Sequence, residues 1–135
     1  DVIIGSRAVD RSKIAIHQSQ AREVGGILFN LMVRLILGLS IQDTQCGFKL
    51  FRREKVWPVF RSQTIYGFGF DPEVLFIAKR RGLTIREIPV AWSHNDGSKV
   101  CFLRDGLEMF LDLARIRWNA LVGKYGKKLK VESDV

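Results

Sequence analysis

Residues 71–92, DPEVLFIAKRRGLTIREIPVAW, are the stretch that decides the fold. The first three residues are typical of a helix start, with Asp71 as the N-cap and a proline at the first helical position. Gly82 ends this helix after a basic last turn. The next ten residues predict a strand, with core side chains at Ile85, Ile88 and Val90.

The segments before and after this stretch extend the same alternation. We expect a buried strand at residues 2–4 that ends at Gly5-Ser6-Arg7, followed by a loop over 8–20. A helix is expected over about 21–37, where Gly38 stops it. A strand over 48–52, a short helix over 53–60 limited by Pro58 and a long helix from about 102 complete the prediction. Strand, helix and strand in this order predict an α/β domain.

The composition sets broad limits on function. The chain has 135 residues, of which 47% are hydrophobic, enough for one domain with a core. It opens on Asp1 without a methionine, so we expect it to follow a segment that is absent here. The net charge of +8 favours an anionic partner, such as a phosphorylated substrate, an anionic membrane or nucleic acid. Two cysteines are too few for a disulfide framework and predict reduced thiols.

Residues 43–49, DTQCGFK, combine an acid, an amide, a thiol and a base around a glycine. A site for a phosphorylated or sugar substrate would use most of these groups, with Gly47 allowing close backbone approach and Lys49 countering phosphate charge. The alternative is a turn into a strand, with Asp43 as a cap. From the residues alone the two interpretations are evenly balanced.

Three further candidates are weaker. Arg7 at a strand end could grip phosphate with two hydrogen bonds, or sit in a surface ion pair. Asp71 could face a cleft, although an N-cap needs no other role. The stretch that contains Ser98 and Lys99 could bind phosphate or form an ordinary turn, and it lacks the P-loop pattern.

The long C-terminal helix is predicted to be amphipathic. Its apolar face comprises Leu103, Leu107, Phe110, Ala114, Trp118 and Leu121, and its polar face Arg104, Glu108, Asp112, Arg115 and Asn119. With the lysines that follow, it could lie in a membrane interface, or it could pack on this domain. No segment predicts a transmembrane span, because Asn30 and Arg34 interrupt the most apolar run.

Taken together, these stretches resemble one family. Residues 43–51 (DTQCGFKLF) closely resemble a signature of the dolichyl-phosphate β-glucosyltransferases and their prokaryotic polyprenyl-phosphate relatives. Residues 2–7 (VIIGSR), 69–78 (GFDPEVLFIA) and 88–100 (IPVAWSHNDGSKV) match in the same order, and the helix from 104 to 117 resembles the segment that follows. The resemblance covers nearly the whole chain.

The resemblance implies a family-2 glycosyltransferase with the GT-A fold for nucleotide sugars. Such enzymes transfer a sugar from a nucleotide sugar such as UDP-glucose to a polyprenyl or dolichyl phosphate, with inversion of the anomeric carbon. The motif version Thr44-Gln45-Cys46 resembles that of enzymes that transfer glucose, so the resemblance implies glucose as the sugar. Residues 1–100 would be the acceptor-side half of the catalytic domain, and 101–135 an interfacial helix with a basic tail. The resemblance implies a location at the cytoplasmic face of a membrane. It leaves open whether the protein forms a homo-oligomer.

The family roles carry over to individual residues. Arg7 and Arg22 would bind phosphate, although Gly26 stands where the related mannosyl enzymes have a serine. Asp43 and Gln45 would lie at the active-site edge, and Asp71 where these enzymes often keep a catalytic carboxylate. The remaining phosphate-binding candidates are Lys49, Ser98 and Lys99.

The main departure is the absence of an Asp-x-Asp motif, which binds the metal in this family. We therefore expect the Mg²⁺ or Mn²⁺ ligands in a missing N-terminal half, no metal site in this chain, and no sugar transfer by the chain alone. The rival functions are a nucleic-acid-binding module, suggested by the charge, and a non-catalytic membrane-docking module. We expect no nucleic-acid partner, because the aromatic residues lie mostly in apolar elements.

Overall fold

A computed structural model describes residues 1–94 and 102–126 of the chain as a mixed α/β fold, which confirms the predicted class. The central sheet has the order β3-β1-β4. Strand β1 (Val2–Ser6) pairs antiparallel with β3 (Lys49–Phe51) and parallel with β4 (Ile85–Pro89). A second, two-stranded sheet pairs β2 (Ile14–Ile16) with β5 (Trp92–Ser93) in parallel.

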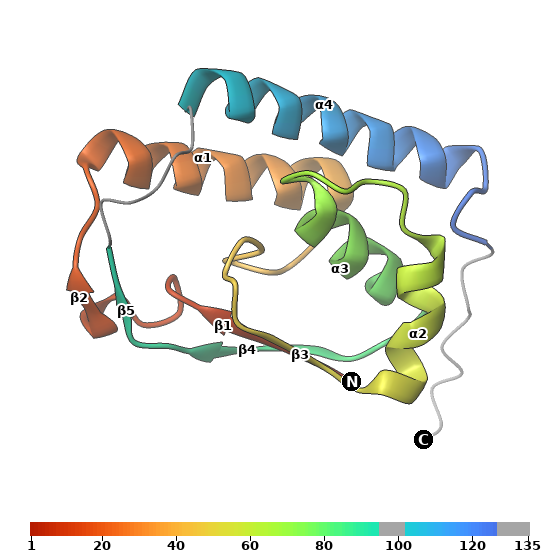
Figure 1. Ribbon diagram of the computed structural model, residues 1–135, viewed down its shortest axis with the longest axis horizontal. Helices are drawn as coiled ribbons and strands as arrows, with labels where there is room; N and C mark the ends of the chain where they lie inside the picture. The colour runs from red at the N-terminus through yellow and green to blue at the C-terminus, as the bar shows by residue number, and fades with distance from the viewer. Residues whose placement is uncertain (95–101, 127–135) are drawn as a thin grey trace.

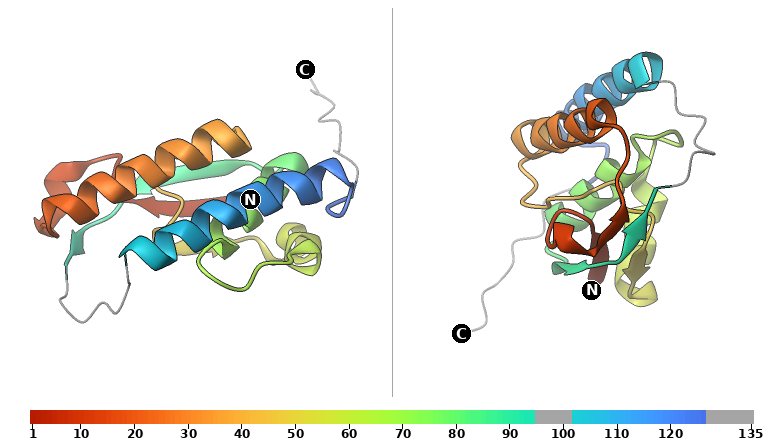
Figure 2. Two further views of the ribbon diagram at one scale, coloured as in Figure 1. Left: turned by 90° about the horizontal axis from the view of Figure 1, so that it is seen from above. Right: turned by 90° about the vertical axis from the view of Figure 1, so that its left-hand side faces the viewer.

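The helices form a layer over one face of the central sheet (Figure 1). Helix α1 (Gln20–Leu37) and helix α4 (Phe102–Leu121) run side by side, and α3 (Phe70–Arg80) lies between α4 and the sheet (Figure 2). Helix α2 (Arg53–Ser62) packs beside α3 and contains Pro58 without ending there. Gly38 adopts a positive φ of 67° and ends α1, as predicted.

Two boundary predictions were wrong. Residues 8–20 were expected to form a loop, but they contain the short 3-10 helix η1 (Arg11–Lys13) and strand β2. The single strand expected over residues 83–92 is divided between two sheets as β4 and β5. Ile85 and Val90 pack against the core as predicted, but the prediction of Ile88 as a core residue was wrong, because its side chain is 40% exposed.

The core explains which face of each helix is buried. Phe29, Val33 and Leu37 of α1 point inward, and α3 is buried along almost its whole length. Helix α4 contributes Leu113 and Ile116, both fully buried. The apolar face predicted for α4, which begins at Leu103, is exposed instead. This helix carries apolar side chains on two sides, and the side with Leu113 and Ile116 packs against the core. Asn119, predicted on the polar face, is 2% exposed.

A buried carboxylate joins α3 to the C-terminal end of α4. Glu73 accepts hydrogen bonds from the backbone N–H groups of Thr64 and Ile65, from the Thr64 hydroxyl at 2.7 Å and from the Tyr125 hydroxyl at 2.7 Å. Asn119 donates to the Thr64 and Tyr125 hydroxyls. Each partner compensates for removing the carboxylate from water.

Candidate phosphate-binding site

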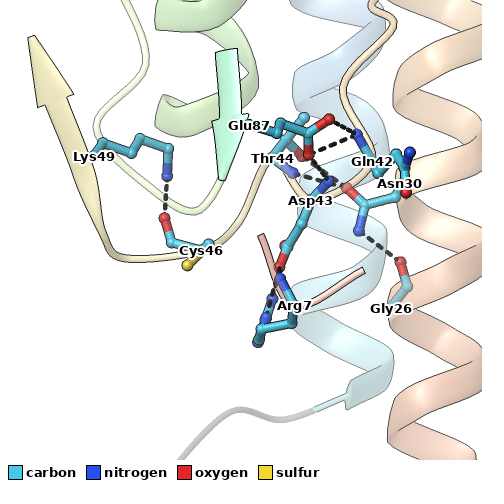
Figure 3. A network of polar contacts seen from close by, with 9 residues as sticks. All are labelled: Arg7, Gly26, Asn30, Gln42, Asp43, Thr44, Cys46, Lys49 and Glu87. Carbon is cyan, nitrogen blue, oxygen red and sulfur yellow. Dashed lines mark hydrogen bonds and ion pairs between the residues drawn. The ribbon is translucent and has the colours of Figure 1, made fainter. Parts of the chain in front are cut away.

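The centre of the candidate site is an ion pair between Arg7 and Asp43. Strand β1 ends one residue before Arg7, and Asp43 lies on the loop that follows α1. The Arg7 Nε and Nη2 atoms donate to the two Asp43 carboxylate oxygens at 2.7 and 2.8 Å, and the Arg7 backbone N–H donates at 3.0 Å (Figure 3). This two-pronged geometry fixes the guanidinium plane.

Both charges of this pair are stabilised. Burial would raise the pKa of the Asp43 carboxyl, but the hydrogen bonds and charge of Arg7 offset that effect and hold the pKa below its ordinary value. The hydrogen bond to Asp43 likewise raises the pKa of Arg7. The guanidinium also lies 5.3 Å from the centre of the Trp92 ring, in cation–π range.

Side chains from two other elements hold the Asp43 loop in place. Glu87 on β4 accepts hydrogen bonds from the backbone N–H groups of Gln42 and Asp43 at 2.9–3.0 Å. Asn30 on α1 accepts from the backbone N–H and the hydroxyl of Thr44, at 3.1 and 2.9 Å (Figure 3). The loop is thus tied to the strand and the helix on either side, which limits where Asp43 can move.

A pocket of about 300 Å³ opens beside the Arg7–Asp43 pair. Helix α1 forms one wall, and the segment from Arg7 to Ile14 together with Trp92 forms another. Three arginines line the pocket, at positions 7, 11 and 34, together with the carboxylates Glu23 and Asp43 and the apolar side chains Ile14, Ile27, Leu31 and Trp92. The lining therefore combines cationic and apolar groups.

The structure divides the residues proposed from the sequence into several places. Arg7 and Asp43 line the pocket, whereas Arg22, in the first turn of α1, is not among its lining residues. Gln45 donates to the Phe68 backbone carbonyl at 3.0 Å. Ser98 and Lys99 lie outside the described residues. The motif over residues 43–49 thus contributes one pocket residue, Asp43, and several structural contacts.

Lys49 and Asp71 form a second, separate ion pair. The Lys49 Nζ lies 2.7 Å from Asp71 Oδ1 and also donates to the Cys46 backbone carbonyl, and the lysine side chain is only 7% exposed. The predicted N-cap role of Asp71 was wrong, because α3 begins at Phe70 with Gly69 as its cap. Asp71 lies inside the first turn of the helix, where its carboxylate is available to Lys49.

Sequence reasoning missed several pocket and support residues. Arg34 and Asn30 were read only as interruptions of an apolar run, and Glu87 as part of a strand. For Asn30 and Arg34, the spacing along α1 offers a signal, because positions 27, 30, 31 and 34 recur at helical intervals and all line the pocket. Arg11 and Glu23 pair at 2.8 Å at the same wall.

The described residues hold no candidate metal centre. Within residues 1–94 and 102–126, no group of three or more His, Cys, Asp or Glu side chains could hold a metal ion.

Comparison with curated proteins gives close relatives along most of the chain. The chain is 39% identical over 125 residues to a dolichyl-phosphate β-glucosyltransferase of Saccharomyces cerevisiae, and the match covers 92% of this chain and 37% of the yeast protein. The corresponding human protein is 36% identical over 124 residues, covering 92% and 38%. The chain is a relative of the dolichyl-phosphate β-glucosyltransferases. This confirms the resemblance found in the sequence.

The extent of the match to these glucosyltransferases is partial. The chain spans 34–40% of the length of the curated relatives compared. The relative from Dictyostelium discoideum is 36% identical over 124 residues, which is 90% of this chain and 38% of that protein. No protein-family model matches the chain, and no solved structure matches it.

Proposed function

We propose that this chain is the acceptor-side part of an inverting glycosyltransferase domain of the GT-A type. The complete domain would transfer glucose from UDP-glucose to the phosphate of a dolichyl or polyprenyl lipid. The observation that carries the proposal is the sequence identity of 36–39% to dolichyl-phosphate β-glucosyltransferases over 85–92% of the chain. The pocket beside Arg7, with its cationic and apolar lining, supports an acceptor of this chemistry.

The chemistry proposed makes modest demands on these residues. A lipid phosphate oxygen is already an anionic nucleophile, so positioning matters more than proton removal. Arg7, fixed by Asp43, would hold that phosphate in line with the sugar. A divalent cation, Mg²⁺ or Mn²⁺, would stabilise the leaving nucleotide diphosphate, and its ligands would come from residues outside this chain.

The direct test uses the full-length protein in detergent or vesicles with labelled UDP-glucose and dolichyl phosphate. We expect dolichyl phosphate glucose with the inverted anomeric configuration, and much less product from GDP-mannose supplied in parallel. The 135-residue chain alone should give no product. Transfer only from GDP-mannose, or transfer to a protein instead of a lipid, would contradict the proposal.

The proposed location is a membrane surface, and the outward sides of α1 and α4 support it. Both helices expose apolar side chains on the side away from the sheet, including Leu35 at 76%, Leu103 at 84% and Leu121 at 72% exposure. In the described part of the chain, no helix is long and apolar enough to cross a membrane. An apolar face of this kind would enter the headgroup region without spanning the bilayer.

A vesicle assay tests this location. Aspartate at Leu103 and Leu107 should reduce co-sedimentation of the full-length protein with vesicles that contain anionic lipid. Trp57→Asp on α2, a side chain of similar exposure at 56%, is the matched control and should leave binding unchanged. Equal binding of all three proteins would exclude α4 as the membrane-binding element.

A further inference from the structure

Arg34 is a pocket residue with no role in the function proposed so far. It lies on α1 one helical turn after Asn30 and Leu31, and all three side chains line the pocket beside Asp43. Its side chain is exposed, unlike the half-buried Arg7. The position gives Arg34 access to a ligand from the open side of the pocket.

The pairing of charges around the pocket singles out Arg34. Arg7 is neutralised by Asp43, and Arg11 by Glu23. Among residues 1–94 and 102–126, no hydrogen bond or ion pair engages the Arg34 side chain. The lining therefore carries an excess of one positive charge, located on Arg34, and its five N–H donors are available to an anion.

The apolar part of the lining begins next to this charge. Ile27 and Leu31 line the pocket and are 55% and 46% exposed. They continue into Val24, Leu28 and Leu35 on the outward side of α1, which are also exposed. A ligand that fits this arrangement has an anionic head for the arginines and an apolar tail for the helix surface.

We propose that Arg34 binds the phosphate of the lipid acceptor together with Arg7, and that the isoprenoid chain leaves the pocket over Ile27 and Leu31. This inference rests on the proposed function and adds a specificity residue to it. Asp43 orients Arg7 and lowers its net charge, so Arg34 supplies the uncompensated charge that attracts the phosphate. Arg34 is thus the residue that distinguishes a prenyl phosphate from a prenyl alcohol.

The test measures binding in the full-length protein by calorimetry with a soluble ten-carbon prenyl phosphate. Loss of one hydrogen-bonded charge predicts binding about tenfold weaker or more for Arg34→Gln. Arg34→Lys, which keeps the charge but not the planar fork, should lose less. Arg53→Gln, an exposed arginine on α2, is the matched control and should bind as the wild type does. Circular dichroism checks that each variant is folded.

Two further ligands separate the head from the tail. The matching prenyl alcohol should bind weakly and equally to wild type and Arg34→Gln. Inorganic phosphate should bind more weakly than prenyl phosphate, and equal binding of the two would overturn the path over Ile27 and Leu31. In transfer assays, Arg34→Gln should raise the KM for the lipid and leave the KM for UDP-glucose unchanged. A rise in both would indicate a merely structural role.

The outcomes distinguish this inference from the proposed function. If the wild type transfers glucose and Arg34→Gln binds prenyl phosphate as well as the wild type, the role of Arg34 is overturned and the function stands. If the wild type binds prenyl phosphate through Arg34 but transfers no glucose, the function is overturned and the binding site stands. Failure of the wild type to bind prenyl phosphate overturns the inference.

Discussion

Removal of the Tyr125 hydroxyl tests how strongly the Glu73 network holds α4 against the domain. In Tyr125→Phe, Glu73 loses a hydrogen bond of 2.7 Å but keeps its bonds from Thr64 and Ile65, so no buried group is left without a partner. Hydrogen bonds to charged groups contribute about 1.5–3 kcal/mol. Because the network stays largely satisfied, we expect a loss of about 1.5–2 kcal/mol in the free energy of unfolding.

The assay is urea unfolding of the full-length protein at pH 7. With a slope of about 2 kcal/mol/M, the midpoint should fall by about 0.75–1 M without a change in slope. Tyr66→Phe is the matched control, since this tyrosine is 86% exposed, and it should change stability by less than about 0.5 kcal/mol.

The pH dependence gives an independent signature. Burial, followed by the hydrogen bond to Glu73, raises the pKa of Tyr125 from 10.0 to about 12. The folded state therefore keeps the hydroxyl proton more tightly than the unfolded state, and this contribution is complete below pH 10 and lost as the pH rises to about 12. The stability difference between wild type and Tyr125→Phe should shrink over that interval. A small difference that does not vary with pH would refute the reasoning.

Two other changes test the site and its support. Asp43→Ala should destabilise the protein by about 3–5 kcal/mol, because Arg7 is left as a half-buried charge without its partner, and lipid transfer should fall with it. Because folding lowers the pKa of Asp43, the stabilising contribution of this carboxylate to the free energy of unfolding is complete above the ordinary value of 3.8 and is lost as the pH falls below it. The urea midpoints of wild type and Asp43→Ala should therefore converge in acid. Gly69→Ala should cost about 1–3 kcal/mol by thermal or urea unfolding, because its Cβ would lie 2.5 Å from Asp112 side-chain atoms. Gly67→Ala, whose Cβ would meet nothing within 4 Å, should be close to neutral and is the control.

The sequence predicted the regular elements well where local signals decide them. The strand at Val2, the helix that stops at Gly38 and the α/β class all follow from apolar runs and turn residues. The N-cap assignment of Asp71 failed because α3 begins one residue earlier, at Phe70, and the Asp71 carboxylate instead pairs with Lys49, which is distant in sequence. Periodicity also found the apolar face with Leu103 on α4, but it could not say which of two apolar faces packs inward.

The candidate site was predictable only in part for the same physical reason. Motif matching found Arg7, directly after β1, and Asp43, in the loop between α1 and β3, because both lie in short stretches that resemble the family signature. It did not find Arg34, because an arginine within an apolar helix reads only as an interruption until the neighbouring wall is known. Nor does sequence spacing indicate that Glu87, more than forty residues away, holds the backbone of Asp43.

The polar residues around Asp43 are explained by the burial of its loop. Leu39, Ile41, Asp43 and Thr44 are all nearly inaccessible to water, and a buried loop has no sheet partner for its backbone N–H groups. Side chains supply the acceptors instead, with Glu87 from β4 and Asn30 from α1. The same contacts that satisfy the loop also fix the Asp43 carboxylate, and through it the plane of Arg7. The guanidinium is therefore oriented before any ligand arrives, and a phosphate needs to order only Arg34 on binding.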